Sequence, residues 1–254
     1  MEMVLLTAIG VGGATVFGAV IGFVFKNISH KFSDIVLSFA AGVMLSAAIL
    51  GLILPSVEYG NLFITIAGIF VGAISLNLID RLVPHLHRLV GVDGENPNSA
   101  GLSKVLLFVS AIAIHNLPEG AACGAIFAGI LTGEGTVTLA GAVALSIGIA
   151  IQNFPEGVII SLPMRGAGYS KVKAFAAGAM SGIVEPIGAV AVLFLASAVT
   201  PVLPYLLAFA AGAMIYVAVK ELLPAAAMEG ASNLGTLTFA VGFAVMMVLD
   251  VVLA

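Results

Sequence analysis

Two short segments of the chain repeat the same combination of an amide, a proline and a carboxylate. Segment 112–120 reads IAIHNLPEG and segment 149–157 reads IAIQNFPEG, so seven of nine positions are identical. Both lie within long apolar stretches, and a third acid, Glu185, lies in another such stretch beside Pro186. A charge at the middle of a membrane costs about 2.5–3.5 kcal/mol on insertion scales. No Lys or Arg lies at comparable depth, so these acids must be protonated, hydrated or bound to cations.

The residues around these acids favour a divalent metal. His115 and Glu119 are four positions apart, so they share one face of a helix, and Gln152 and Glu156 repeat this spacing. Imidazole, carboxylate and amide oxygen ligands suit Zn, Fe, Co or Ni better than sodium or potassium. Two helices that each present a carboxylate at the same depth can bridge two metals. The candidate ligands are His115, Asn116, Glu119, Gln152, Asn153, Glu156 and Glu185, with the thioether of Met44 as an alternative to ordinary packing.

The prolines beside the acids favour the same interpretation. Proline has no N–H, so each one leaves the carbonyl four residues before it without a helical partner. Such a carbonyl is tolerated in a membrane only where it faces protein or a wet cavity. The prolines are Pro118, Pro155 and Pro186, and the carbonyls are those of Ile114, Ile151 and Gly182.

The elements that must hold these side chains are membrane-spanning helices. Of 254 residues, 61% are hydrophobic and 9% are charged, whereas soluble domains average about 45–50% and about 25%. This composition excludes a soluble enzyme, a disordered chain and a nucleic-acid-binding protein. The net charge of −4 is too small to steer a polyanion. The single cysteine, Cys123, excludes a disulfide framework and a cysteine-ligated zinc module.

Continuous apolar runs of about 20 residues, the length that crosses a bilayer, predict an all-α integral membrane protein with one transmembrane domain over 1–254. We expect eight spans, at about 3–25, 35–57, 61–83, 103–131, 136–163, 172–199, 203–224 and 232–254, and an inner loop at about 84–102. With the N-terminus outside, all nine Lys and Arg residues fall on the inner side, as the positive-inside rule requires. The sequence thus predicts a multi-pass protein with both termini on the outer side.

A second repeat relates the two ends of the chain at a constant offset of 170 residues. The matches are 18–20 with 188–190, 39–42 with 209–212, Gly72 with Gly242, and Asp80 with Asp250. Three spans that are five spans away from their copies have the opposite orientation, which predicts a 3+2+3 inverted repeat. Inverted repeats are a mark of secondary transporters that bind substrate near the bilayer midplane. The mate of Glu185 is Thr15, so the repeat places an acid in only one half.

The doubled motif and Glu185-Pro186 resemble the signature helices of the ZIP (Zrt/Irt-like) divalent metal transporters, above all their bacterial branch with short loops. The resemblance covers all eight spans and implies a transporter rather than an enzyme. It implies uptake of Zn²⁺, and also of Fe²⁺, Mn²⁺, Co²⁺ or Cd²⁺, toward the cytoplasm across the plasma (inner) membrane. The metal is then a substrate, and no cofactor is expected. The resemblance further implies alternating access, in which a bundle of spans 1, 4, 5 and 6 slides against spans 2, 3, 7 and 8, often in a homodimer within the lipid bilayer.

The resemblance also implies how the ligands are divided between two metals. The first metal would be held by His115, Glu119, Gln152 and Glu156, with Met44 as a further ligand; the second would be held by Asn116, Asn153 and Glu185 together with the bridging Glu119 and Glu156. Many members carry a second histidine or an aspartate on span 5, where this chain has Gln152 and Asn153. The second site therefore has less negative charge here, which leaves its occupancy open.

Two other functions remain open from the sequence. An intramembrane zinc-dependent hydrolase could use a zinc held by His115 and Glu119 to activate water, although no His-Glu-x-x-His pair is present. A cation or proton channel could use the acids as a relay. The roles of several outlying residues are also open, namely Glu58, His85, His87, Cys123, Glu221 and Asp250.

Overall fold

The computed structural model describes residues 2–25, 29–89, 100–133, 138–166, 168–195, 200–226 and 233–253. Every element in these ranges is helical. In chain order they are α1 (Glu2–Val24), α2 (His30–Ser46), η1 (Ala47–Ile53), α3 (Leu54–Tyr59), α4 (Leu62–Leu89), α5 (Ala100–Thr132), α6 (Leu139–Gly166), α7 (Lys171–Phe194), η2 (Thr200–Val202), α9 (Leu203–Val217), η3 (Ala218–Leu222), α10 (Leu223–Ala226) and α11 (Asn233–Leu253).

The prediction of an all-α membrane protein is confirmed. Among the described residues, seven helical runs are long and apolar enough to cross a bilayer, and α5 adds a helix of 33 residues. One of the seven runs, Lys31–Tyr59, is made of α2, η1 and α3 in continuous succession. The helices extend further into the expected inner loop at 84–102 than the sequence suggested, because α4 ends only at Leu89 and α5 already begins at Ala100.

Polar residues fix where several helices begin. Ser29 and Ser170 accept hydrogen bonds from the backbone N–H groups three residues ahead, at 3.2 and 3.3 Å, and so cap α2 and α7. Asn61 caps α4 in the same way, and Thr138 caps α6. A side-chain oxygen at this position satisfies backbone donors that a helix start leaves free. The breaks between the helices are therefore encoded locally.

Two π-helical turns precede prolines at corresponding places in the two halves of the chain. η1 leads into Pro55, and η3 leads into Pro224. Proline cannot donate to the carbonyl four residues before it, and a widened turn accommodates this loss without ending the helix. Helical structure therefore continues through both prolines, to Tyr59 in the first run and to Ala226 in the second.

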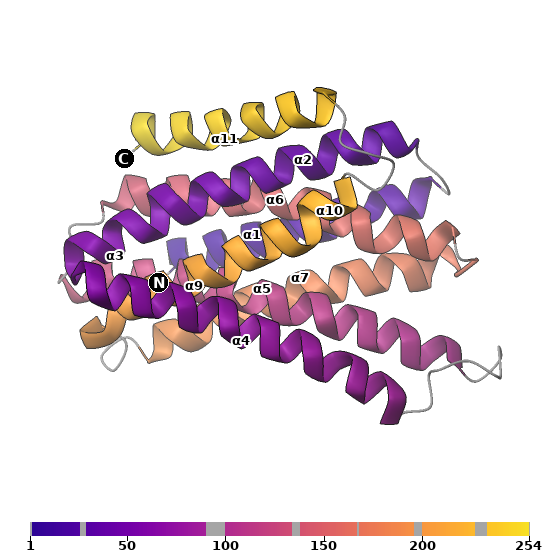
Figure 1. Ribbon diagram of the computed structural model, residues 1–254, viewed down its shortest axis with the longest axis horizontal. Helices are drawn as coiled ribbons and strands as arrows, with labels where there is room; N and C mark the ends of the chain where they lie inside the picture. The colour runs from indigo at the N-terminus through magenta and orange to yellow at the C-terminus, as the bar shows by residue number, and fades with distance from the viewer. Residues whose placement is uncertain are drawn as a thin grey trace.

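The long helices run side by side along the longest axis of the molecule (Figure 1). Their most extensive contacts pair α1 with α6, α5 with α7, α1 with α7, α4 with α9 and α2 with α11. We call α1, α5, α6 and α7 the first helix group, and α2, α4, α9 and α11 the second. The doubled motif lies on α5 and α6, and Glu185 lies on α7, so the first group carries all the candidate metal ligands except Met44, which lies on α2.

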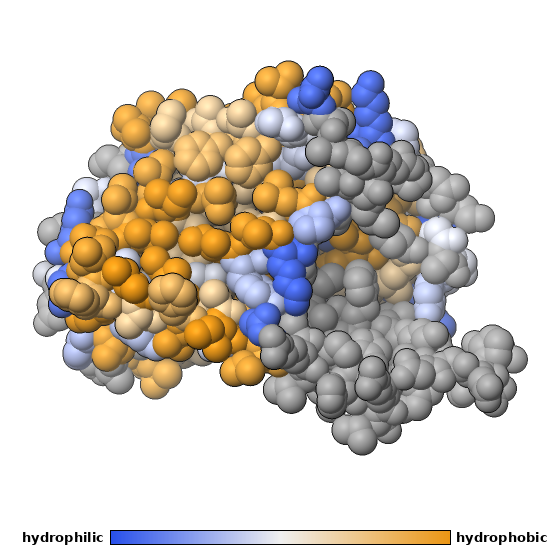
Figure 2. Space-filling view, in the orientation of Figure 1, coloured by the Kyte–Doolittle hydropathy of each residue, from blue (hydrophilic) through white to orange (hydrophobic). Residues whose placement is uncertain are grey.

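Large apolar side chains cover the outside of the helices. Phe17, Phe63 and Phe194 are 71%, 83% and 80% exposed, respectively. Figure 2 shows apolar residues over much of the described surface of one face, with few polar ones among them. Exposed aromatic and aliphatic side chains on this scale match a surface that contacts lipid tails.

Candidate metal centre

Three helices bring the polar residues of the membrane interior into the protein core. Asn116, Glu119, Gln152, Asn153, Glu156 and Glu185 are all buried, with Glu156 the most exposed of them at 8%. Buried polar groups are stable only when other groups satisfy them, so their contacts show what each one is arranged to bind.

Glu119 and Gln152 form the first contact between the two copies of the motif. Gln152 on α6 donates from Nε2 to Oε1 of Glu119 on α5 over 2.7 Å. The remaining oxygens, Oε2 of Glu119 and Oε1 of Gln152, are buried and have no hydrogen-bond partner. A buried acceptor without a donor calls for a specific explanation. A carboxylate oxygen and an amide oxygen left in this way are suited to coordinating a divalent cation.

Glu185 forms a separate cluster with donors from three other helices. Oε1 accepts hydrogen bonds from the hydroxyl of Thr15 on α1, at 3.1 Å, and from Nδ2 of Asn116 on α5, at 2.9 Å. Oε2 accepts a hydrogen bond from Nδ2 of Asn153 on α6. Thr15, Asn153 and Glu185 are fully buried. One carboxylate on α7 is thus hydrogen-bonded to every other helix of the first group.

Both asparagine amides of this cluster also bind backbone. Nδ2 of Asn116 donates to the carbonyl of Ser181 on α7 over 3.3 Å, and Nδ2 of Asn153 donates to the carbonyl of Val11 on α1 over 3.2 Å. Oδ1 of Asn153 is buried without a hydrogen-bond partner. Because a carboxylate and a carbonyl are both acceptors, these contacts fix which end of each amide faces Glu185.

Glycines let the helices that carry the cluster approach one another closely. A Cβ at Gly120 would overlap the backbone carbonyl of Glu185, and a Cβ at Gly157 would overlap the carbonyl of Thr15. Small residues at helix crossings allow such backbone contacts in membranes. The final Gly of each Pro-Glu-Gly sequence therefore packs its helix against α7 or α1 beside the acid that precedes it.

The carbonyl that Pro186 leaves without a helical donor faces protein. The oxygen of Gly182 lies against Gly12 of α1, where a Cβ would overlap it. This contact agrees with the expectation that such a carbonyl is covered by protein or water in a membrane.

Of the remaining predicted ligands, one is a residue of the hydrophobic core and one lies outside the described side chains. His115 is on α5, one turn before Glu119, but its side chain is outside the described ones, as are those of His85, His87 and Glu221. Met44 on α2 is fully buried in the main hydrophobic core. Among the side chains that the structure describes, no three of His, Cys, Asp and Glu form a group that could hold a metal ion. Cys123 is buried and lies 3.7 Å from the hydroxyl of Ser146.

Two further acids share a cavity at the end of the molecule where α3 and α11 finish. Glu58 and Asp250 line this cavity of about 300 Å³ together with Tyr59 and Thr138. Glu58 is exposed, and Asp250 is half-buried. The hydroxyl of Tyr59 is buried without a hydrogen-bond partner. The cavity thus presents carboxylates and a phenol at one end of the helices.

Sequence reasoning did not include Thr15 and the carbonyls of Val11 and Ser181 among the polar contacts of the site. The signal for Thr15 was present, since it is the mate of Glu185 at the 170-residue offset. The two carbonyls carry no signal of their own, because any residue type offers one.

Comparison with known proteins places these residues in a family. The sequence profile described as ZIP Zinc transporter matches residues 91–250. The zinc transporter ZIP11 of Homo sapiens is 33% identical, over 94% of this chain and 94% of its own length. The zinc transporter ZIPB of Bordetella bronchiseptica is 34% identical over 94% of this chain and 78% of its own length. The zinc transporter ZupT of Chlorobaculum parvum is 34% identical over 88% and 87%. With the asparagine and the glutamate of each motif copy buried on α5 and α6, the chain belongs to the ZIP family of zinc transporters.

Proposed function

We propose that this protein carries Zn²⁺ across the membrane through a site between α5 and α6. The site consists of Glu119, Gln152 and Glu156, with His115 one turn before Glu119 on the same helix. The observation that carries the proposal is the pair of buried oxygens on Glu119 and Gln152 that no donor satisfies. Zinc accepts carboxylate, imidazole and amide ligands, and neutral histidine is among its commonest ligands.

The relatives support zinc as the substrate. ZIP11, ZIPB and ZupT are all named zinc transporters. Iron, manganese, cobalt and cadmium share the same ligand chemistry, so we expect Fe²⁺, Mn²⁺, Co²⁺ and Cd²⁺ to compete with Zn²⁺ to different degrees. Met44 stays a candidate ligand on α2 within the same proposal.

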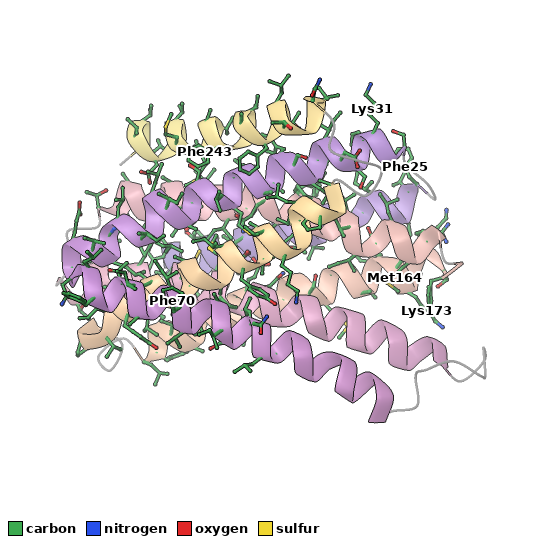
Figure 3. All side chains as sticks on the ribbon, viewed as in Figure 1. Phe25, Lys31, Phe70, Met164, Lys173 and Phe243 are labelled. Atoms are coloured by element: carbon green, nitrogen blue, oxygen red, sulfur yellow. The ribbon has the colours of Figure 1, made fainter. Side chains whose placement is uncertain are left out.

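We infer that the metal moves toward the cytoplasm across the inner (plasma) membrane. Lys31 and Lys173 lie at the same end of the molecule, and the C-terminus lies at the opposite end (Figures 1 and 3). Basic residues favour the cytoplasmic side, which supports an orientation with both termini outside. In that orientation the cavity with Glu58 and Asp250 opens to the outside.

We also propose that the chain is a 3+2+3 inverted repeat, as the 170-residue offset predicts. Four close contacts of glycines support it. A Cβ at Gly42 would overlap the Phe239 carbonyl, and its mate Gly212 stands in the same relation to Ile69. Gly72 and its mate Gly242 likewise approach the carbonyls of Phe209 and Phe39. Each contact is converted into its partner by exchanging the two halves.

The same symmetry extends to the two central helices. Gly157 on α6 faces the carbonyl of Thr15, and the corresponding Gly120 on α5 faces the carbonyl of Glu185, the mate of Thr15. This relation supports an exchange of α5 with α6 and of α1 with α7 about an axis through the centre of the site. A substrate near such an axis lies at the bilayer midplane.

Alternating access is the transport mechanism that we propose for this arrangement. Within each helix group, most of the closely packed glycines contact backbone carbonyls of the neighbouring helix. Between the groups, glycines instead meet the ends of side chains: Gly129 faces Leu203, and Gly148 faces Met246. Gly51 on η1, which continues α2, likewise faces the side chain of Leu145 on α6. Backbone contacts hold helices at fixed separation, whereas flexible side chains can repack. The first group can therefore move as a unit against the second, within a protomer or a homodimer.

The test is uptake of radioactive ⁶⁵Zn²⁺ into proteoliposomes that contain the purified protein. We expect saturable uptake that unlabelled Fe²⁺, Mn²⁺, Co²⁺ and Cd²⁺ inhibit to different extents. Uptake that stays linear with zinc concentration would favour a channel, and proteoliposomes no more permeable to zinc than empty ones would refute the proposal.

A further inference from the structure

Glu185 is held by neutral donors from three directions. Thr15 and Asn116 donate to one oxygen, and Asn153 donates to the other. An ionised carboxylate is an acceptor only, so these contacts satisfy it through hydrogen bonds alone. The donors come from α1, α5 and α6, while Glu185 itself is on α7.

The two amides cannot turn their oxygens toward Glu185 without losing other bonds. Each Nδ2 group bridges Glu185 and a backbone carbonyl, that of Ser181 for Asn116 and that of Val11 for Asn153. A rotation of either amide by half a turn would place its oxygen against two acceptors. The nitrogen ends therefore face the carboxylate, and a nitrogen that bears two protons does not coordinate a cation.

The metal-binding oxygens lie elsewhere. The buried oxygens without donors on Glu119 and Gln152 belong to a separate contact. Oδ1 of Asn153 is also buried without a donor, and it is the opposite end of the amide from the nitrogen that donates to Glu185. Within the described side chains, Glu119, Glu156 and Glu185 do not form a group of three that could hold one metal. The carboxylate of Glu185 and the oxygens of the metal site are thus divided between two polar clusters.

We propose that Glu185 is a structural hub that joins the four helices of the first group, and that this chain binds one transported metal rather than two. The amide nitrogens of Asn116 and Asn153 supply to Glu185 the positive partial charge that a second metal would supply. This inference rests on the proposed function, because it concerns the number of metals at the same site. It also identifies Asn153 as the residue that sets this number.

The decisive substitution is Asn153→Asp. It replaces an amide donor beside Glu185 by a second carboxylate, and two adjacent buried carboxylates need a metal ion or a shared proton between them. We expect the count of bound Zn²⁺ per chain, measured by elemental analysis of the purified full-length protein in detergent, to rise from one in the wild type to two in the variant. Asn77→Asp is the matched control, because Asn77 lies on α4 and contacts Tyr216 instead; its count should stay at one.

Two outcomes overturn the inference alone. The first is a wild type that transports zinc and binds two zinc ions per chain. The second is a folded Asn153→Asp variant that still binds only one zinc ion per chain. If that variant does not elute as a single species in gel filtration, the wild type and Glu185→Gln decide. Glu185→Gln keeps an acceptor oxygen and should still bind one zinc ion per chain. If the Glu185→Gln variant binds no zinc, Glu185 is a metal ligand. A wild type that holds no zinc would refute the proposed function as well.

Discussion

Gln152 donates a hydrogen bond of 2.7 Å to Glu119, and these two residues occupy different positions in the two copies of the same motif. Gln152 stands where the first copy has His115, and Glu119 stands where the second copy has Glu156. The contact therefore links the start of one copy to the end of the other. It joins the two motif helices and leaves one buried oxygen of each side chain without a donor.

Glu119→Ala and Glu156→Ala should each nearly abolish zinc uptake while the protein still inserts into the membrane. Each removes a buried carboxylate from the proposed site, and the alanine side chain offers no oxygen to replace it. Uptake of ⁶⁵Zn²⁺ at matched protein density in proteoliposomes measures the effect. Asn77→Ala, which changes an amide on α4 outside the site, should keep normal uptake. Normal uptake by either Glu variant would remove that residue from the site.

Thr15→Val should destabilise the protein. The substitution keeps the side-chain volume but removes the hydroxyl that donates to Glu185 over 3.1 Å. A hydrogen bond to a charged group contributes about 1.5–3 kcal/mol. Thermal unfolding in detergent, followed by circular dichroism, should show a lower midpoint for Thr15→Val, with Thr15→Ser close to the wild type. Equal midpoints for all three proteins would mean that the hydroxyl contributes nothing to Glu185.

Gly18→Ala should destabilise the contact between α1 and α6, because its Cβ would overlap the carbonyl of Phe154. Overpacking of this kind costs about 1–3 kcal/mol. Gly13→Ala, on the same helix, is the matched control, since nothing lies within 4 Å of its Cβ position. The midpoint of thermal unfolding should fall for Gly18→Ala and should not fall for Gly13→Ala. A fall of the same size in both would point to a general effect of alanine on α1.

Glu58→Gln combined with Asp250→Asn should raise the zinc concentration needed for half-maximal uptake several-fold, without changing the number of zinc ions bound. The two acids line one cavity at an end of the protein. Negative charge at a cavity raises the local concentration of cations there. The difference from the wild type should shrink at high ionic strength, because salt screens exposed charges. A difference that is independent of salt would indicate direct coordination in the cavity.

Much of the fold could be predicted from the sequence, because continuous apolar runs of this length indicate membrane-spanning helices. Four helix starts also carry N-cap residues of the preferred types, namely Ser29, Asn61, Thr138 and Ser170. The C-terminal end of α4 and the start of α5 were less predictable, since polar residues near a membrane surface are compatible with either helix or loop. Helix α4 continues to Leu89, whereas the predicted span ended at about residue 83.

The site was predictable in composition but not in its internal contacts. Residue types and spacing indicated Glu119, Gln152 and Glu185 as members of one polar region. Which end of an asparagine amide faces a carboxylate depends on backbone carbonyls from other helices, here that of Val11 for Asn153. Such contacts follow from how α1 and α6 are packed, and spacing along one helix does not specify them.

The pairing of Thr15 with Glu185 has a consequence for the origin of the chain. Under the proposed exchange of halves, each is the other's mate, and Gly12 likewise lies against its mate Gly182. In an ancestral dimer of two identical chains, an acid at this position would have faced an identical acid, and a threonine would have faced a threonine. Only after gene duplication and fusion could the two positions diverge into a donor and an acceptor. The hydrogen bond is therefore a trait that a symmetric homodimeric ancestor could not have possessed.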